Sequence, residues 1–251
     1  MARVLCISSQ TVFGPVGNSA AVPALQAAGH EVMQIPTVLL SNHPGLGKPA
    51  GQSTPTALME EMFQALERVG AFNDLAAVMT GYFTSAAQVI AVTKQIIALK
   101  AQHESLQVLV DPVMGDHGKL YVAEDVADAI RSELLPLATI TTPNIFELEW
   151  LAGEADISGA VSKLHIAETI VTSIPAANEL ETQLYADGKI FVRSIARHKN
   201  VPNGTGDFLA GCYLAERLTA PAAAAFEHAM TRLHSSILRS AGTTTLKLSP
   251  E

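Results

Sequence analysis

The sequence predicts an α/β fold with a central, mainly parallel β-sheet flanked by helices on both faces. Strand-like and helix-like stretches alternate along its 251 residues, and repeated strand–helix units imply parallel strands joined by right-handed crossovers. Hydrophobic residues make up 48% of the chain, which supplies the large core that such a sheet requires. No internal repeat or linker interrupts the alternation, so residues 1–251 are interpreted as one domain.

The first half of the chain is expected to open with a strand at residues 3–8. A turn rich in Gly, Ser and Asn follows, and then a helix of small residues that ends at Gly29, a common helix stop. Residues 56–69 carry apolar side chains at helical spacing. The other expected elements are an extended segment at 32–40, a loop at 41–54, a strand at 75–80, a helix at 86–100 and a strand at 106–110.

The second half is expected to add a hairpin and a pair of C-terminal helices. Asp187-Gly188 lies between two strand-like runs, which predicts a β-ribbon of residues 183–186 and 190–195. The other expected elements are a helix at 125–135, a strand at 139–141, a helix at 145–151, a strand at 169–172, helices at 208–218 and 221–240, and an extended tail.

Charge and cysteine content narrow the class of protein. The net charge of −8 and the lack of any Lys/Arg run argue against a nucleic-acid surface. Cys6 and Cys212 lie in apolar surroundings and are interpreted as buried thiols in a reducing compartment. The apolar part of the first residues is too short for a signal peptide, and no apolar run reaches membrane-spanning length. The expectation is a cytoplasmic protein with no membrane or nucleic-acid partner.

The turn Gly204-Thr205-Gly206-Asp207 is the strongest candidate for chemistry. Two glycines let the backbone turn tightly, so that several N–H groups can point at one spot. That spot lies at the start of the apolar helix expected at 208–218, where unpaired N–H groups favour an anion. An aspartate beside an anion site is expected only if it caps the helix or accepts a proton. For the isolated pattern the cap is the commoner case, and both remain open.

Polar residues follow most of the expected strands. Ligands of parallel sheets bind beyond the carboxyl ends of the strands, so these residues are expected to meet at one edge. Loops are polar in general, so this pattern by itself identifies an edge and no reaction. The residues concerned are Ser8-Ser9-Gln10, Gly81-Tyr82, Asp111 and Asp116, Thr142-Pro143-Asn144 with Glu147, Thr172-Ser173, and the 204–207 turn.

Six motifs in a fixed order carry a resemblance over almost the full length. They are the stretch 9–20 (SQTVFGPVGNSA), 38–43 (VLLSNH), 80–82 (TGY), 111–116 (DPVMGD), 142–147 (TPNIFE) and 204–207 (GTGD). In this order they resemble the pyridoxal kinases (pyridoxine/pyridoxamine kinases) of the ribokinase-like superfamily. The resemblance implies a ribokinase-like fold and a homodimer. It also implies ATP-dependent transfer of the γ-phosphoryl group to the 5′-hydroxymethyl of pyridoxal, pyridoxine or pyridoxamine, a step of vitamin B6 salvage.

The resemblance assigns roles on the vitamin side. Asp207 is the base that accepts the hydroxyl proton as the oxygen attacks. Ser9 hydrogen-bonds the pyridine ring, His43 supplies a polar edge and Tyr82 an aromatic wall. Without the resemblance, His43 would be a loop histidine bonded to the backbone. The anion hole for the phosphoryl group consists of the N–H groups of Gly204, Thr205 and Gly206.

The resemblance also assigns a nucleotide and metal side. Glu147 is expected at Mg²⁺ bound with ATP, through water, with Tyr121 as a second candidate in a loop that can cover the site. A monovalent cation such as K⁺ is also allowed. Asn144-x-x-Glu147 fits a capping box as well, and the other residues fit strand ends. The ATP-binding residues by resemblance are Asp111, Thr142, Asn144 and Thr172.

Two departures and two alternatives accompany the resemblance. Pro44 stands where many members have threonine, and residues 159–184 form a shortened stretch that weakens the assignment of Thr172. Lys199, in the loop expected to pass over the adenine or its phosphates, receives no role. A hydroxymethylpyrimidine (phosphate) kinase of the same fold is disfavoured, because its opening carries a Gly-Gly-Ala-Gly type stretch. A non-catalytic ligand-binding relative is disfavoured by the aspartate at 207, which mere binding does not need.

Overall fold

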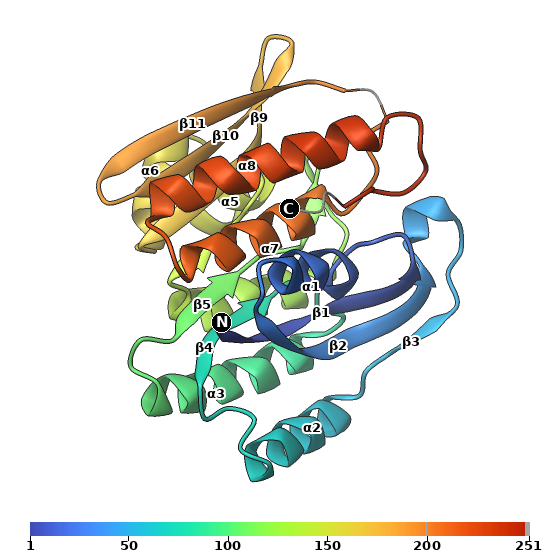
Figure 1. Cartoon of the computed structure of the whole chain (residues 1–251), viewed down its shortest axis with the longest axis vertical. Coiled ribbons are helices and arrows are strands. Elements are labelled where there is room, and N and C mark those ends of the chain that lie inside the picture. The colour runs from blue at the N-terminus through green and yellow to red at the C-terminus, as the bar shows by residue number, and fades with distance from the viewer. Residues whose placement is uncertain (199, 249–251) are drawn as a thin grey trace.

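The computed structural model describes residues 1–198 and 200–248, and its main feature over those residues is a nine-stranded sheet of order β11-β10-β9-β8-β5-β4-β1-β2-β3 (Figure 1). The inner pairs from β2 to β9 are parallel, and β3, β10 and β11 add antiparallel pairs at the two sides. The mainly parallel α/β sheet expected from the sequence is therefore confirmed. The sheet strands are β1 (Arg3–Phe13), β2 (Glu31–Asn42), β3 (Gly51–Ser53), β4 (Leu75–Thr80), β5 (Gln107–Val110), β8 (Ile140–Thr141), β9 (Glu168–Ala176), β10 (Glu179–Ala186) and β11 (Lys189–Ala196).

Helices cover both faces of this sheet because side chains of its central strands alternate between two cores. Val4 and Cys6 of β1 belong to the core beneath α1, α7 and α8, whereas Leu5 and Ile7 belong to the core beneath α2, α3 and α4 (Figure 1). This is the two-residue period of a strand buried on both sides. The helices are α1 (Asn18–Ala27), α2 (Thr56–Arg68), α3 (Ala86–Gln102), α4 (Glu124–Ala129), α5 (Ile145–Ala152), α6 (Ile157–Leu164), α7 (Thr205–Arg217) and α8 (Ala222–Arg239).

Several strand and loop boundaries differ from those expected from the sequence. The reason is that strands pair with residues far away in the chain, which local patterns do not reveal. The first strand was expected to end at residue 8, but β1 continues to Phe13 after a bulge, since its last residues pair with the end of β2. The expected loop 41–54 contains β3 and a single turn of 3₁₀ helix at Pro44–Leu46. A two-stranded ribbon, β6 (Gly115–Asp116) with β7 (Lys119–Leu120), was not expected at all.

The sequence analysis also missed one helix and gave the wrong helix type for part of another. α6 was not expected, although Asp156 supplies a recognisable signal: its side chain accepts a hydrogen bond of 2.7 Å from the Gly159 N–H as an N-cap. The helix expected at 125–135 is α-helical only to Ala129 and continues as a π-helical turn at Ile130–Leu134. Over the ranges that the structure describes, no helix is both long and apolar enough to cross a membrane.

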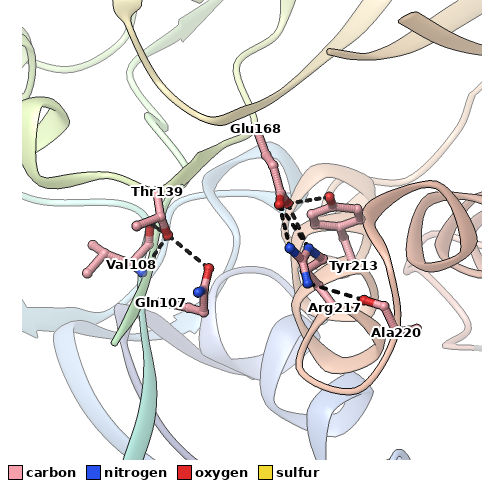
Figure 2. A network of polar contacts seen from close by, with 7 residues as sticks. All are labelled: Gln107, Val108, Thr139, Glu168, Tyr213, Arg217 and Ala220. Carbon is pink, nitrogen blue, oxygen red and sulfur yellow. Dashed lines mark hydrogen bonds and ion pairs between the residues drawn. The ribbon is translucent and has the colours of Figure 1, made fainter. Parts of the chain in front are cut away.

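A buried polar network fixes α7 against the start of β9 (Figure 2). Glu168, the first residue of β9, accepts a 2.6 Å hydrogen bond from the Tyr213 hydroxyl and a 2.9 Å bond from Arg217 Nε. Both donors lie in the second half of α7, so this half lies beside the beginning of the strand. The first turn of α7 therefore lies towards the other end of the strands, at the carboxyl ends of the parallel strands.

Candidate active site

The opening loop and the start of α7 meet at two glycines. Gly204, the N-cap of α7, has φ 101°, and a Cβ there would overlap the carbonyl oxygen of Pro15. Gly17, just before α1, has φ 55°, and a Cβ there would overlap the hydroxyl and carbonyl oxygens of Ser9. Glycine is therefore required at both positions, because the backbone conformation and the close approach each exclude a side chain. This packing brings Ser9 and the 204–207 turn to one place.

Asp207 lies in the first turn of α7 and is bound by backbone amides. The N-cap of the helix is Gly204, so Asp207 is the third residue of the helix and not the N-cap. Its carboxylate accepts hydrogen bonds from the N–H of Gly17 and from its own N–H. Burial raises the pKa of Asp207 to about 6, against these two N–H groups, which lower it. A carboxylate with such a pKa is mostly ionised at neutral pH and can still accept a proton.

Asp207 is one of a group of acidic side chains that we call the carboxylate cluster: Asp111, Asp116, Glu147 and Asp207. Burial raises the pKa of Asp111 well above its usual value, and the charges of Asp207 and Glu147 raise it further. The pKa of the Tyr121 hydroxyl is also raised, first by burial and then by all four carboxylates. These effects place side chains from the end of β5, from β6 and from the starts of α5 and α7 near one another, so the site concentrates negative charge.

Glu147 uses most of its oxygen lone pairs on backbone amides. Its Oε2 accepts from the Asn144 N–H at 2.9 Å, and the Asn144 side chain accepts from the Glu147 N–H at 2.9 Å. This is the capping box that the sequence also allowed. Oε1 accepts from the N–H groups of Met114 and Gly115 at 3.0 and 3.4 Å. Burial nevertheless raises the pKa of Glu147 to about 7. Three of about four acceptor positions are filled, so little room remains for a direct ligand.

The residues expected at the nucleotide phosphates lie side by side, just after β5, just after β8 and in the middle of β9. The Thr142 hydroxyl donates to Asp111 Oδ1 at 2.9 Å, and both side chains are buried. The Thr172 N–H donates to the Pro143 oxygen at 3.0 Å, and Asn144 forms a parallel bridge with Thr172. The structure therefore brings Thr172 to the same end of the strands as Asp111, Thr142 and Asn144, although it lies within the shortened stretch 159–184.

The residues expected at the vitamin come from three different strand ends. Ser9 is buried at the bulge of β1 against Gly17. The Tyr82 N–H, just after β4, donates to the neighbouring Ser8 hydroxyl at 3.1 Å, and its ring is partly exposed. His43 follows β2 and starts the 3₁₀ turn in which Pro44 is the first residue, a position where proline fits well. His43 does bond to the backbone, because its Nδ1 accepts from the Gly45 N–H at 3.0 Å.

Two hollows include residues that sequence reasoning missed. The first contains His43 together with Asn203 and the C-terminal residues 244–246. The second is lined by His198, residues 200–202 and the end of α8 with residues 240–242. The position of Asn203 directly before Gly204 was an available signal, whereas no local pattern could assign the C-terminal residues. Lys199 lies outside the described residues.

Comparison with known proteins supports the resemblance. Residues 14–247 match the family described as phosphomethylpyrimidine kinase. The pyridoxine/pyridoxal/pyridoxamine kinase of Bordetella avium is 38% identical over 219 residues, which are 81% of this chain and 73% of that protein.

Solved structures give the same result for the fold. The pyridoxal kinase of Entamoeba histolytica superimposes with a TM-score of 0.91 at 27% identity, covering 98% of this chain and 92% of that one. The Leishmania donovani pyridoxal kinase in complex with ADP and pyridoxamine gives 0.88 at 28% identity, covering 96% and 88%. The chain therefore belongs to the phosphomethylpyrimidine kinase family and, within it, to the pyridoxal kinases with a ribokinase-like fold.

Proposed function

We propose that this protein is a pyridoxal kinase that transfers the γ-phosphoryl group of ATP to the 5′-hydroxymethyl of pyridoxal, pyridoxine or pyridoxamine. The observation that carries this function is the ionisable carboxylate of Asp207, bound by the Gly17 N–H beside the first turn of α7. Relatives of this chain are named for the same activity, and one related structure contains ADP together with pyridoxamine.

Proton transfer and phosphoryl binding occur at neighbouring atoms in this arrangement. The first helical hydrogen bond of α7 runs from the Phe208 N–H to the Gly204 oxygen, so the N–H groups of Thr205 and Gly206 lie outside the helical ladder. We assign these two groups and the Gly204 N–H to the transferring phosphoryl group. Asp207 accepts the hydroxyl proton as the oxygen attacks, and the nearby phosphoryl charge makes that transfer more favourable.

The nucleotide and its cation fit the edge that carries the carboxylate cluster. The charges of Asp207 and Glu147 raise the pKa of Asp111, and that of Asp116 raises the pKa of Glu147, which marks a site where a cation relieves repulsion. Among the described residues no three His, Cys, Asp or Glu side chains are arranged to hold a metal. Mg²⁺ keeps several waters and binds substrate phosphates, so it needs few protein ligands.

We therefore place a hydrated Mg²⁺ near Asp111 and Glu147, where it neutralises phosphate charge, and leave Tyr121 as a further ligand candidate. K⁺ remains allowed at the same edge. We assign ATP phosphates to Asp111, Thr142, Asn144 and Thr172. The adenine is assigned to the second hollow, between residues 198–202 and the end of α8.

The assembly and location of the enzyme are part of the same proposal. One sheet with strands from residues 3 to 196 supports a single kinase domain over 1–251. Val12, Phe13 and Leu39 expose apolar side chains on the neighbouring strands β1 and β2. We propose a homodimer whose contact lies there. Light scattering of the purified protein would contradict the dimer if it returned the mass of one chain. Two free, buried cysteines suit a reducing cytoplasm.

The assay that tests the function measures ATP turnover with each candidate acceptor alone. Pyridoxal, pyridoxine, pyridoxamine and hydroxymethylpyrimidine are supplied separately with Mg²⁺. We expect turnover with at least one of the three vitamers to exceed that with hydroxymethylpyrimidine. The opposite order would favour the phosphomethylpyrimidine kinase activity that the family description carries.

The pH dependence of the reaction should report the ionisation of Asp207. Its pKa is raised to about 6, so the carboxylate is protonated below that pH and cannot accept the hydroxyl proton. We therefore expect kcat/KM for the vitamer to rise with pH through about 6 and then to level off. The measurement is a kcat/KM profile at fixed excess Mg²⁺–ATP. A profile that is flat from about pH 5 upward would contradict a base with this pKa.

A further inference from the structure

His43 has two hydrogen-bond donors at one ring nitrogen. Its Nδ1 lies 3.0 Å from the Gly45 N–H and 3.2 Å from the Asn203 Nδ2. The Gly45 N–H can only donate, so Nδ1 must be the unprotonated nitrogen. The ring proton is then on Nε2. The Asn203 amide, whose two orientations are otherwise equivalent, must present its NH₂ group to the same nitrogen.

The surroundings of His43 keep the ring neutral. Every element around the hollow presents uncharged groups to it: Gly14 and Val16 from the opening loop, Leu46, Asn203, and residues 244–246. Burial lowers the pKa of His43 below its usual value. Among the described residues, none that lines this hollow has a carboxylate to stabilise an imidazolium. At neutral pH the ring therefore has one donor, Nε2–H, for which residues 1–198 and 200–248 supply no acceptor.

The contact with Asn203 joins two loops that carry different parts of the reaction. Asn203 directly precedes Gly204, the first residue of the anion hole, and His43 belongs to the vitamin-side loop. The approach depends on Gly45, where a Cβ would lie 2.9 Å from His43 Nδ1 and 3.1 Å from Asn203 Nδ2. The backbone thus comes close enough to leave no room for a side chain between the two partners.

We propose that Asn203 is a positioning residue: it binds the Nε2–H tautomer of His43 that the Gly45 N–H selects, holds the ring in place and couples the vitamin-side loop to the anion-hole loop. His43 then donates to an acceptor on the substrate ring, such as its phenolic oxygen in the ionised form. The tautomer and the Asn203 contact do not depend on the function proposed above. The effect on vitamer binding rests on that function.

The test combines histidine NMR with kinetics on three variants. Long-range ¹H–¹⁵N spectra of the ¹⁵N-labelled, ligand-free protein distinguish the tautomers, and His43→Gln identifies the His43 signals among the eight histidines. Asn203→Ala removes the donor, whereas Asn203→Asp replaces it with an acceptor of the same shape. The control is Asn73→Asp, the same chemical change at an exposed position before β4, at the opposite edge of the sheet.

The expected results differ between the variants. The unsubstituted protein and Asn73→Asp should show neutral His43 with the proton on Nε2. Asn203→Ala should keep the proton on Nε2, because the Gly45 N–H remains. Its KM for the vitamer should rise about three- to tenfold, with KM for ATP within about twofold, because one neutral hydrogen bond that holds the ring is lost. Asn203→Asp should raise the pKa of His43 and add a new ionisation to the pH profile of kcat/KM for the vitamer.

Two outcomes would overturn the proposal: a proton on Nδ1 in the unsubstituted protein, or an Asn203→Ala variant with an unchanged KM for the vitamer. A failure of the function looks different. The unsubstituted protein would then turn over none of the vitamers, while the NMR signals would still report the tautomer.

Discussion

Asp207→Asn is expected to lower kcat by about two to four orders of magnitude while ATP affinity stays within a few-fold. The amide keeps the shape of the side chain and can still accept hydrogen bonds from the Gly17 N–H and its own N–H. It cannot take the proton of the attacking hydroxyl. Removing one negative charge from the carboxylate cluster also lowers the repulsion towards ATP, so nucleotide binding has no reason to weaken. Steady-state kinetics and ATP titration measure the two effects.

A matched control separates the loss of a base from the loss of a charge. Asp74→Asn makes the same change on an exposed side chain just before β4, away from the strand ends, and should leave kcat within about twofold. The residual activity of Asp207→Asn should also lose the rise with pH through about 6, because the group that causes it is gone. Turnover close to that of the unsubstituted protein would remove Asp207 from the role of base.

The central sheet could be predicted from the sequence because its signals are local. Apolar runs such as 75–80 and 106–110 are buried on both faces whatever their neighbours are, and the structure contains both strands. The end of β1 and the short β3 were not predictable in the same way. Val12 and Phe13 are exposed, and only their pairing with β2 makes them strand. β3 has three exposed residues and no period to detect.

The residues of the candidate site were predicted from the order of the motifs. The structure adds the contacts between them, which the order of motifs does not reveal. The strand-end argument placed Asp111, Glu147 and Asp207 at one edge, and the pKa effects among them agree. It gave no sign that Glu147 holds the Met114 and Gly115 amides, because those partners lie more than 30 positions away in the chain. The partnership of His43 with Asn203 spans 160 positions and was equally hidden. Long-range contacts of polar side chains leave no periodic trace in a sequence.

Gly204→Ala is expected to lower kcat at least about 100-fold and to destabilise the fold. At φ 101° an alanine is strained by about 1 kcal/mol or more. In addition its Cβ would overlap the Pro15 oxygen, so the opening loop and the start of α7 must move apart. That movement displaces the anion-hole amides from the Gly17 N–H that binds Asp207, and a shift of about 1 Å is enough to cost 100-fold in rate. We expect Tm to fall by about 4–8 °C, the effect of about 2 kcal/mol in a chain of this size.

The separate contribution of close packing can be measured with Gly29→Ala. Gly29 has φ 79°, and a Cβ there meets no atom within 4 Å. It follows the C-terminal end of α1, ahead of β2 and away from the strand ends that form the site. This variant carries the backbone strain without the overlap, so Tm should fall by only about 2–4 °C and kcat should stay within about twofold. If Gly204→Ala lost no more activity than Gly29→Ala, contact between the Pro15 carbonyl and the start of α7 would not be what aligns the base with the anion hole. A large excess loss at position 204 would instead show that the rate depends on how closely these two loops approach.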